Sequence, residues 1–160
     1  MRSIREINDV FESIANRHAE LNGFFTNSAE ETAIDQYDVT KFPYLYAQCT
    51  NLSIAEGVTK FTYVVQVADM VVEREQKELT DVYSAMHLIW QDVIAVLHNT
   101  LFSNKTFGNM GSLTMEMPVR LDAFTSQNND LVTGFEAQLV ISTPNELDLC
   151  NSLGNGGPLA

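Results

Sequence analysis

Two apolar patterns of different period meet in the middle of this sequence and restrict the folds open to it. Apolar residues alternate with mixed positions from Lys60 to Val72, which predicts a strand. One face of that strand would carry Phe61, Tyr63, Val65 and Val67. From Leu79 to His98 the apolar residues recur at steps of three and four, which predicts a long helix. Its apolar stripe would comprise Val82, Met86, Ile89, Trp90, Val93, Val96 and Leu97.

The beginning of the sequence has a helical pattern of its own. Apolar residues recur at helical spacing from Ile4 to Leu21, and Ser3 with Glu6 matches a capping box. Asn22-Gly23 follows as a stop signal, because glycine readily takes the left-handed conformation that ends a helix. The acidic stretch after it is turn-rich, with a short strand as one interpretation of residues 32–36.

Three further strands are predicted from alternation and turn signals. They cover residues 42–49, 114–124 and 132–142. Pro43 lies at the start of the first strand or on an edge, where a residue without a backbone donor is tolerated. The polar turn at 126–130 joins the other two strands into an antiparallel hairpin. The polar, glycine-bearing segments 51–60 and 99–111 are expected to be connections.

The order of predicted elements is helix, two or three strands, long helix and hairpin. Strands that are grouped around helices, instead of alternating with them, favour an α+β fold with a mainly antiparallel sheet. We expect about four or five strands, with the N-terminal helix and the long helix packed on one face. The length of 160 residues suits one domain. Residues 1–143 would form that domain, and residues 144–160 a loop-like C-terminal tail.

The charge balance disfavours several classes of partner. Nine basic and 21 acidic residues give a net charge of −12, which argues against nonspecific nucleic-acid binding and against a polybasic membrane anchor. Two cysteines without a CxxC pair do not make a disulfide scaffold. We recognise no signal peptide and no apolar run long enough for a membrane helix. A soluble acidic protein made in a reducing compartment is therefore expected.

No group of residues in the sequence matches a catalytic, phosphate-binding or metal-binding motif. His87 and His98 are eleven positions apart on the predicted helix, about 16 Å at 1.5 Å per residue, too far to share one metal ion. His18 at the end of the first helix suits a packed or surface position. The thiols of Cys49 and Cys150 have no histidine near them in sequence. We therefore predict no enzymatic activity, no catalytic residue, no cofactor and no metal site.

Five short strings in a fixed order carry a family resemblance. They are Phe42 to Leu45, Phe61 to Asp69, Glu73 to Ser84, Asp130 to Phe135 and Pro144 to Cys150. With the order of the elements, these strings resemble the tail terminator, tail-completion and neck proteins of tailed bacteriophages. The resemblance covers residues 4–150.

The resemblance implies a structural virion protein of the tail or neck, assembled in the cytoplasm of the bacterial host. Such a protein forms a homo-oligomeric ring, a hexamer in a long-tailed phage or a dodecamer as a neck adaptor. The ring caps the tail tube and connects it to neck and portal-proximal proteins. The genome would pass through without specific binding, and no membrane is involved. Head-to-tail contacts generate such rings when the rotation closes.

Two sets of residues are candidates for roles in such a ring. The interface candidates are Pro43, Tyr44, Tyr46, Pro144, Leu147 and Leu149. The candidates for an acidic lumen or rim are Glu30, Glu31, Glu73, Glu75 and Glu78. Each has a plainer interpretation, as an edge-strand residue, a terminal tail or a solvated helix start.

Three other functions remain open from the sequence. One is a neck or portal-adaptor ring protein of a short-tailed phage. Another is a small acidic adaptor or inhibitor outside phage biology. The third is a small enzyme that uses Cys49 or a pair of carboxylates, for which loss of activity on Cys49→Ser would be the sign.

Overall fold

The computed structural model describes residues 3–26, 42–71, 76–103, 113–125 and 132–145. Within these ranges lie two helices, α1 (Ile4–Arg17) and α3 (Gln76–Ser103). The strands are β1 (Gly23–Phe25), β2 (Tyr44–Ala55), β3 (Val58–Met70), β4 (Thr114–Met115), β5 (Asp122–Thr125) and β6 (Val132–Pro144).

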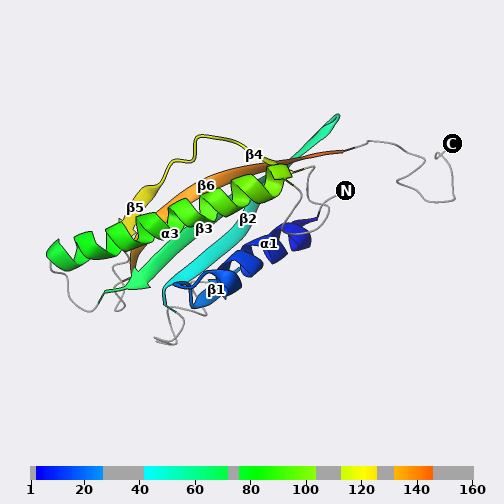
Figure 1. The fold of residues 1–160 in the computed structure, drawn as a ribbon. Coiled ribbons are helices and arrows are strands. Elements are labelled where there is room, and N and C mark those ends of the chain that lie inside the picture. The colour runs from blue at the N-terminus through cyan, green and yellow to red at the C-terminus, as the bar shows by residue number, and fades with distance from the viewer. Residues whose placement is uncertain (1–2, 27–41, 72–75, 104–112, 126–131, 146–160) are drawn as a thin grey trace, which may run out of the picture.

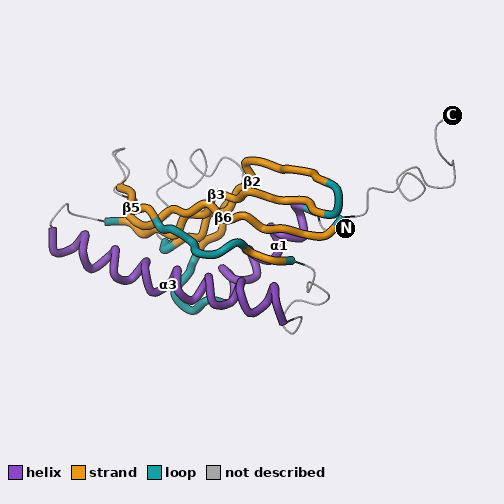
Figure 2. The backbone as a smooth tube through the Cα atoms, turned by 90° about the horizontal axis from the view of Figure 1, so that it is seen from above, coloured by secondary structure: helices purple, strands orange, loops and turns teal. Residues whose placement is uncertain are grey.

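All six strands belong to one sheet, in which the order is β1-β2-β3-β6-β4. β5 also pairs with β6, along the same edge as β4 but nearer the start of β6. β1 is parallel to β2, and every other pairing is antiparallel. Both helices lie on the same face of this sheet (Figures 1 and 2). The predicted α+β fold, with a mainly antiparallel sheet and two helices on one face, is confirmed. The described residues contribute six strands to the sheet, where four or five were predicted.

The main core lies between the helices and the sheet. The face of β3 that begins with Phe61 and ends with Val67 is the buried one, and the residues of β6 paired with that face contribute a second row of core side chains. The core residues of these two strands are Phe61, Tyr63, Val65, Val67, Ala137, Leu139 and Ile141. From α3 the core receives Met86, Ile89, Trp90, Val93 and Leu97. Val96, which was predicted to belong to this stripe, is 37% exposed, so the stripe is narrower than predicted.

No described helix covers the opposite face of the sheet, which is half polar. At one end a small apolar cluster forms around Phe42, Tyr44, Ala68 and Val132. Further along, Gln66 Nε2 donates to Glu136 Oε2 at 2.6 Å across β3 and β6. Antiparallel sheets commonly have one solvated face, and this one follows that rule.

Both helix boundaries differ from the prediction. α1 ends at Arg17 instead of Leu21, and the backbone N–H of His18 caps it by donating to Ile14 O at 2.9 Å. Leu21 is nevertheless buried, so the apolar spacing continued past the end of the helix. The capping box at Ser3 and Glu6 is confirmed. α3 is longer than predicted and extends to Ser103, so the first residues of the expected connection 99–111 are helical.

The predicted connection at 51–60 is wrong. β2 continues to Ala55 and β3 begins at Val58, which leaves only Glu56 and Gly57 as the turn. Gly57 has a φ of +84°, a conformation that glycine adopts without the steric cost of a side chain. The result is a long hairpin whose tip extends past the ends of both helices (Figures 1 and 2).

The predicted strand 114–124 is interrupted. Only β4 and β5 are strands, and both pair antiparallel with β6 as the predicted hairpin requires. Pro118 lies between them and has no backbone N–H for the ladder. The interpretation of residues 32–36 as a strand falls outside the described residues.

Candidate functional site

The described residues contain no group of three or more histidine, cysteine, aspartate or glutamate side chains placed to hold a metal ion. In the same ranges neither helix is both long and apolar enough to cross a membrane.

Cys49 lies on β2 beside the core, and its surroundings do not activate it. Its thiol donates to Asn51 O at 3.5 Å. Burial raises the pKa of the Cys49 thiol, and the hydrogen bond to Asn51 only partly offsets this. A nucleophilic cysteine needs the opposite shift, because the thiolate is the reactive form.

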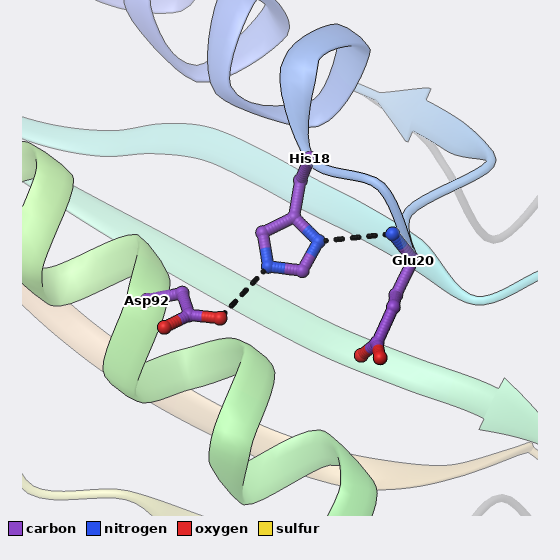
Figure 3. A network of polar contacts seen from close by, with 3 residues as sticks. All are labelled: His18, Glu20 and Asp92. Carbon is purple, nitrogen blue, oxygen red and sulfur yellow. Dashed lines mark hydrogen bonds and ion pairs between the residues drawn. The ribbon is translucent and has the colours of Figure 1, made fainter.

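His18 connects the end of α1 to α3 (Figure 3). Its Nδ1 accepts from the backbone N–H of Glu20 at 3.2 Å, and its Nε2 lies 3.2 Å from Asp92 Oδ2. A neutral ring with its proton on Nε2 satisfies both contacts. Leu88 and Gln91 line the open depression beside this pair. With both ring nitrogens hydrogen-bonded, His18 is best explained as a structural link between the helices, which agrees with the predicted packed or surface position.

The most distinctive surface is the outer part of the β2–β3 hairpin, residues 50–62, which we call the arm. All eight residues from Thr50 to Gly57 are exposed. Two of them are large and apolar: Leu52 is 42% exposed and Ile54 is 62% exposed. They lie two positions apart on one strand and so share a face of the sheet. Leu52 pairs with Phe61, a core residue, so this face is the helix side.

The arm begins at an irregularity in the ladder. The pairing of β2 with β3 shifts between Cys49 and Asn51, which leaves Thr50 as an extra residue. Such a bulge bends a strand and changes the faces that its side chains occupy. It places Leu52 and Ile54 on the helix side, where both side chains remain exposed.

Asn145, just after β6, fastens the tip of the arm. Its side-chain Nδ2 donates to Ala55 O at 3.0 Å and to Thr59 Oγ1 at 2.8 Å. Its Oδ1 accepts from Gly57 N at 3.1 Å, and its own N–H donates to Gly57 O at 3.2 Å. The chain that leaves β6 is therefore fixed at the arm tip.

A hollow beside the arm tip is too small for an ordinary ligand. Gly57, Val58, Thr114 and Pro144 are among the residues that line it, and its volume is about 150 Å³. Small-molecule sites usually start at ~300 Å³. The arm is thus better suited to contact another chain than to hold a small molecule.

The predicted interface residues lie at both ends of the long strands. Pro43 directly precedes β2, and its carbonyl accepts from Asn22 N at 2.8 Å. Tyr44 is 3% exposed and belongs to the small cluster on the open face, so its ring offers little surface to a partner. Tyr46 is half-buried beside that cluster. Pro144 is exposed at the end of β6, next to the arm tip.

The remaining predicted residues are mostly outside the described ranges. This applies to Leu147 and Leu149 of the interface set, and to Glu30, Glu31, Glu73 and Glu75 of the acidic set. Glu78 is described: it is half-buried in the first turn of α3. An acidic residue there is favourably placed against the positive end of the helix dipole.

Sequence reasoning missed the residues that make the arm distinctive. Leu52 and Ile54 alternate with polar residues, and this period-two signal was present. Asn145 gave no signal at all, because its partners Ala55 and Gly57 are about ninety positions away in the sequence. Only the folded arrangement shows that it closes the arm.

Asp69, near the end of β3, gives a prediction about pH. Burial raises the pKa of the Asp69 carboxyl, and the hydrogen bond from Met70 N at 2.8 Å only partly opposes this. The neutral acid is therefore favoured in the folded state. Its contribution to stability is complete at low pH and is lost as the pH rises through the raised pKa. At pH 7 the ionised carboxylate should lower the free energy of unfolding.

Asp69→Asn should therefore stabilise the protein at pH 7 and flatten the pH dependence of its unfolding above pH ~4, the ordinary pKa of an aspartate. Urea unfolding followed between pH 4 and pH 8 measures both effects. Asp122→Asn removes the same charge from a side chain that is 70% exposed, so it controls for the change in net charge. Equal effects of the two variants would contradict the prediction.

Comparison with known proteins adds no identity. No family model matches the chain, and no curated protein matches it.

Proposed function

We propose that this chain is a ring-forming structural protein of a tailed-bacteriophage virion. In this role it caps the tail tube as a tail terminator or tail-completion protein and connects the tail to the neck. The proposal includes no catalysis and no cofactor.

The observation that carries the proposal is the arm. An exposed hairpin with Leu52 and Ile54 on its surface costs solubility in a monomer, because exposed apolar strands invite pairing with other chains. Such a surface is useful when another protein covers it. A protein that assembles head-to-tail into a closed ring needs surfaces of this kind.

The family resemblance supports the more specific part of the proposal. Two of its strings surround features of the fold that matter for assembly. Phe42 to Leu45 opens β2, the strand that leads into the arm. Pro144 to Cys150 starts at the end of β6 and includes Asn145, which fastens the arm tip.

The net charge of −12 suits a ring through which DNA passes. A negatively charged channel does not attract the phosphate backbone, so the genome can slide. Glu30, Glu31, Glu73, Glu75 and Glu78 are the proposed lumen or rim residues. A reconstruction of the ring in which these residues point away from the channel would overturn this part of the proposal.

The location of the protein in purified particles tests the proposal. Gold-labelled antibodies against the chain should mark one spot at the junction of head and tail. Quantitative mass spectrometry should give a copy number of six, or of twelve for a neck adaptor. Labelling along the whole tail, or absence of the chain from particles, would contradict the proposal.

A further inference from the structure

β2 has an outer edge that is only partly covered. On its inner side it pairs with β3 from Tyr44 to Ala55. On its outer side β1 pairs only with residues 44–46. Among the described residues, no strand pairs with the outer side from Ala47 to Ala55. An open edge presents backbone N–H and C=O groups to which a further strand can pair.

Exposed apolar side chains border the outer half of this edge. Leu52 and Ile54 project from β2 itself, toward the helix side. Ile4, at the start of α1, is 43% exposed. Its carbonyl accepts from the Tyr63 hydroxyl at 3.3 Å, so the start of α1 is adjacent to the base of the arm. A strand added to the edge with apolar residues on its helix side would cover Leu52 and Ile54.

The C-terminal segment of this chain has the sequence of such a strand. Fifteen residues follow Asn145. They begin with Glu146-Leu147-Asp148-Leu149-Cys150-Asn151-Ser152-Leu153, in which leucine occupies three of four odd positions and polar residues or cysteine the even ones. A period of two places the leucines on one face of a strand.

The geometry of the arm tip favours a second copy as the source of this strand. Asn145 is fixed where β6 ends, and β3 and β2 lie between it and the open edge. Three strand spacings of ~4.8 Å separate the two places, about 14 Å. About four extended residues would be used in crossing that distance. If the segment added to the edge of its own chain, Leu147 and Leu149 would therefore lie in the crossing and could not pack beside Leu52 and Ile54.

We propose that residues 146–153 of one copy add as a strand to the outer edge of β2, residues 47–55, in the next copy. Leu147 and Leu149 then pack beside Leu52 and Ile54 of that copy. The contact is head-to-tail, because each chain donates a segment at one site and accepts one at another. It would supply the contact between subunits in the proposed ring, but it does not depend on the virion role.

Three variants of the full-length chain test this contact by sedimentation velocity. The arm variant is Leu52→Asp with Ile54→Asp, and the tail variant is Leu147→Asp with Leu149→Asp. The control is Leu88→Asp, because Leu88 is 57% exposed and lies on α3 beside His18, at the opposite end of α1 from the arm. Far-UV circular dichroism confirms that each variant is folded.

The wild-type chain should self-associate as its concentration rises. The arm and tail variants should each weaken association about tenfold or more, since burial of one leucine or isoleucine is worth roughly that factor. The control should associate like the wild type. Self-association that survives in either double variant, or a wild type that stays monomeric up to ~1 mM, would overturn the proposal.

A mixture of the two double variants identifies whose tail is bound. The arm variant retains a normal tail, and the tail variant retains a normal edge. A contact between copies predicts that the mixture forms one-to-one dimers although each variant alone is monomeric. Absence of those dimers would show that the edge is covered within one chain, or not by the tail, and would overturn the proposal. Labelling of virions can succeed or fail independently of this result.

Discussion

Trp90→Ala should lower the free energy of unfolding by about 3–5 kcal/mol, the usual cost of truncating a large buried aromatic side chain. Trp90 is completely buried at the centre of the contact between α3 and the sheet. Its indole N–H also donates to the backbone carbonyl of Phe135 on β6, at 3.0 Å. Truncation removes the ring and leaves that carbonyl without this donor. A loss of this size is a large part of the 5–15 kcal/mol that stabilises typical domains.

Two further variants separate the contributions of Trp90. Trp90→Phe retains most of the apolar volume and loses the donor, so we expect a cost of about 1–3 kcal/mol. Leu88→Ala, on the exposed side of the same helix, should change stability by at most ~0.5 kcal/mol. Urea unfolding should be followed by circular dichroism, because Trp90 is the only tryptophan. A loss below ~1 kcal/mol for Trp90→Ala would contradict the described packing of α3.

Gly134→Ala should be the most damaging single-methyl change in the sheet. Gly134 lies in β6 opposite Ala68 of β3. A Cβ atom at this position would lie 2.0 Å from Val67 O and 2.7 Å from Ala68 Cα. Both atoms belong to the backbone of β3 and cannot rotate away, so the two central strands must separate locally. Overpacking of this kind typically costs about 1–3 kcal/mol, and occasionally more.

Gly57 provides the matched comparison, because it needs glycine for a different reason. A Cβ atom there would meet nothing within 4 Å, but its φ is +84°. Gly57→Ala should cost about 1–2 kcal/mol from backbone strain, and Gly57→Asn less, since asparagine tolerates this conformation. At Gly134 asparagine should be worse than alanine. Unfolding midpoints of the four variants test this, and a milder effect of asparagine at Gly134 would contradict the close approach of β3 and β6.

The layout of the fold was predictable because the spacing of the apolar residues shows which side of a helix or strand is buried. Phe61 to Val67 and Met86 to Leu97 carry the two periods clearly, and they form the main contact between sheet and helix. The same signal misplaced the end of α1, because Leu21 is buried without being helical. It also passed over the break at Pro118, because the flanking residues kept alternating.

The arm could not be predicted from the sequence, and the reason is physical. Its residues are polar or exposed, so they resemble a loop in composition, and its turn consists of only Glu56 and Gly57. What sets it apart is Asn145, whose bonds to Ala55, Gly57 and Thr59 form only when β6 lies beside the hairpin. Contacts between distant parts of a chain leave no local pattern to read.

The proposed assembly role would account for two features of the chain. The arm exposes Leu52 and Ile54 on a strand whose outer edge no described strand covers beyond Tyr46. The segment after Asn145 alternates leucine with polar residues. In the proposed assembly each copy would donate one of these surfaces and accept the other, as a head-to-tail ring requires.

Under the proposed virion role, deletion of this gene from the phage that would carry it, followed by electron microscopy of the lysates, tests the central claim most directly. Restoring the wild-type gene in trans controls for effects on neighbouring genes. We predict overlong or irregular tails that fail to join heads. Tails of normal length beside unattached heads would move the ring to the neck. Normal infectious particles would contradict a structural role in the virion.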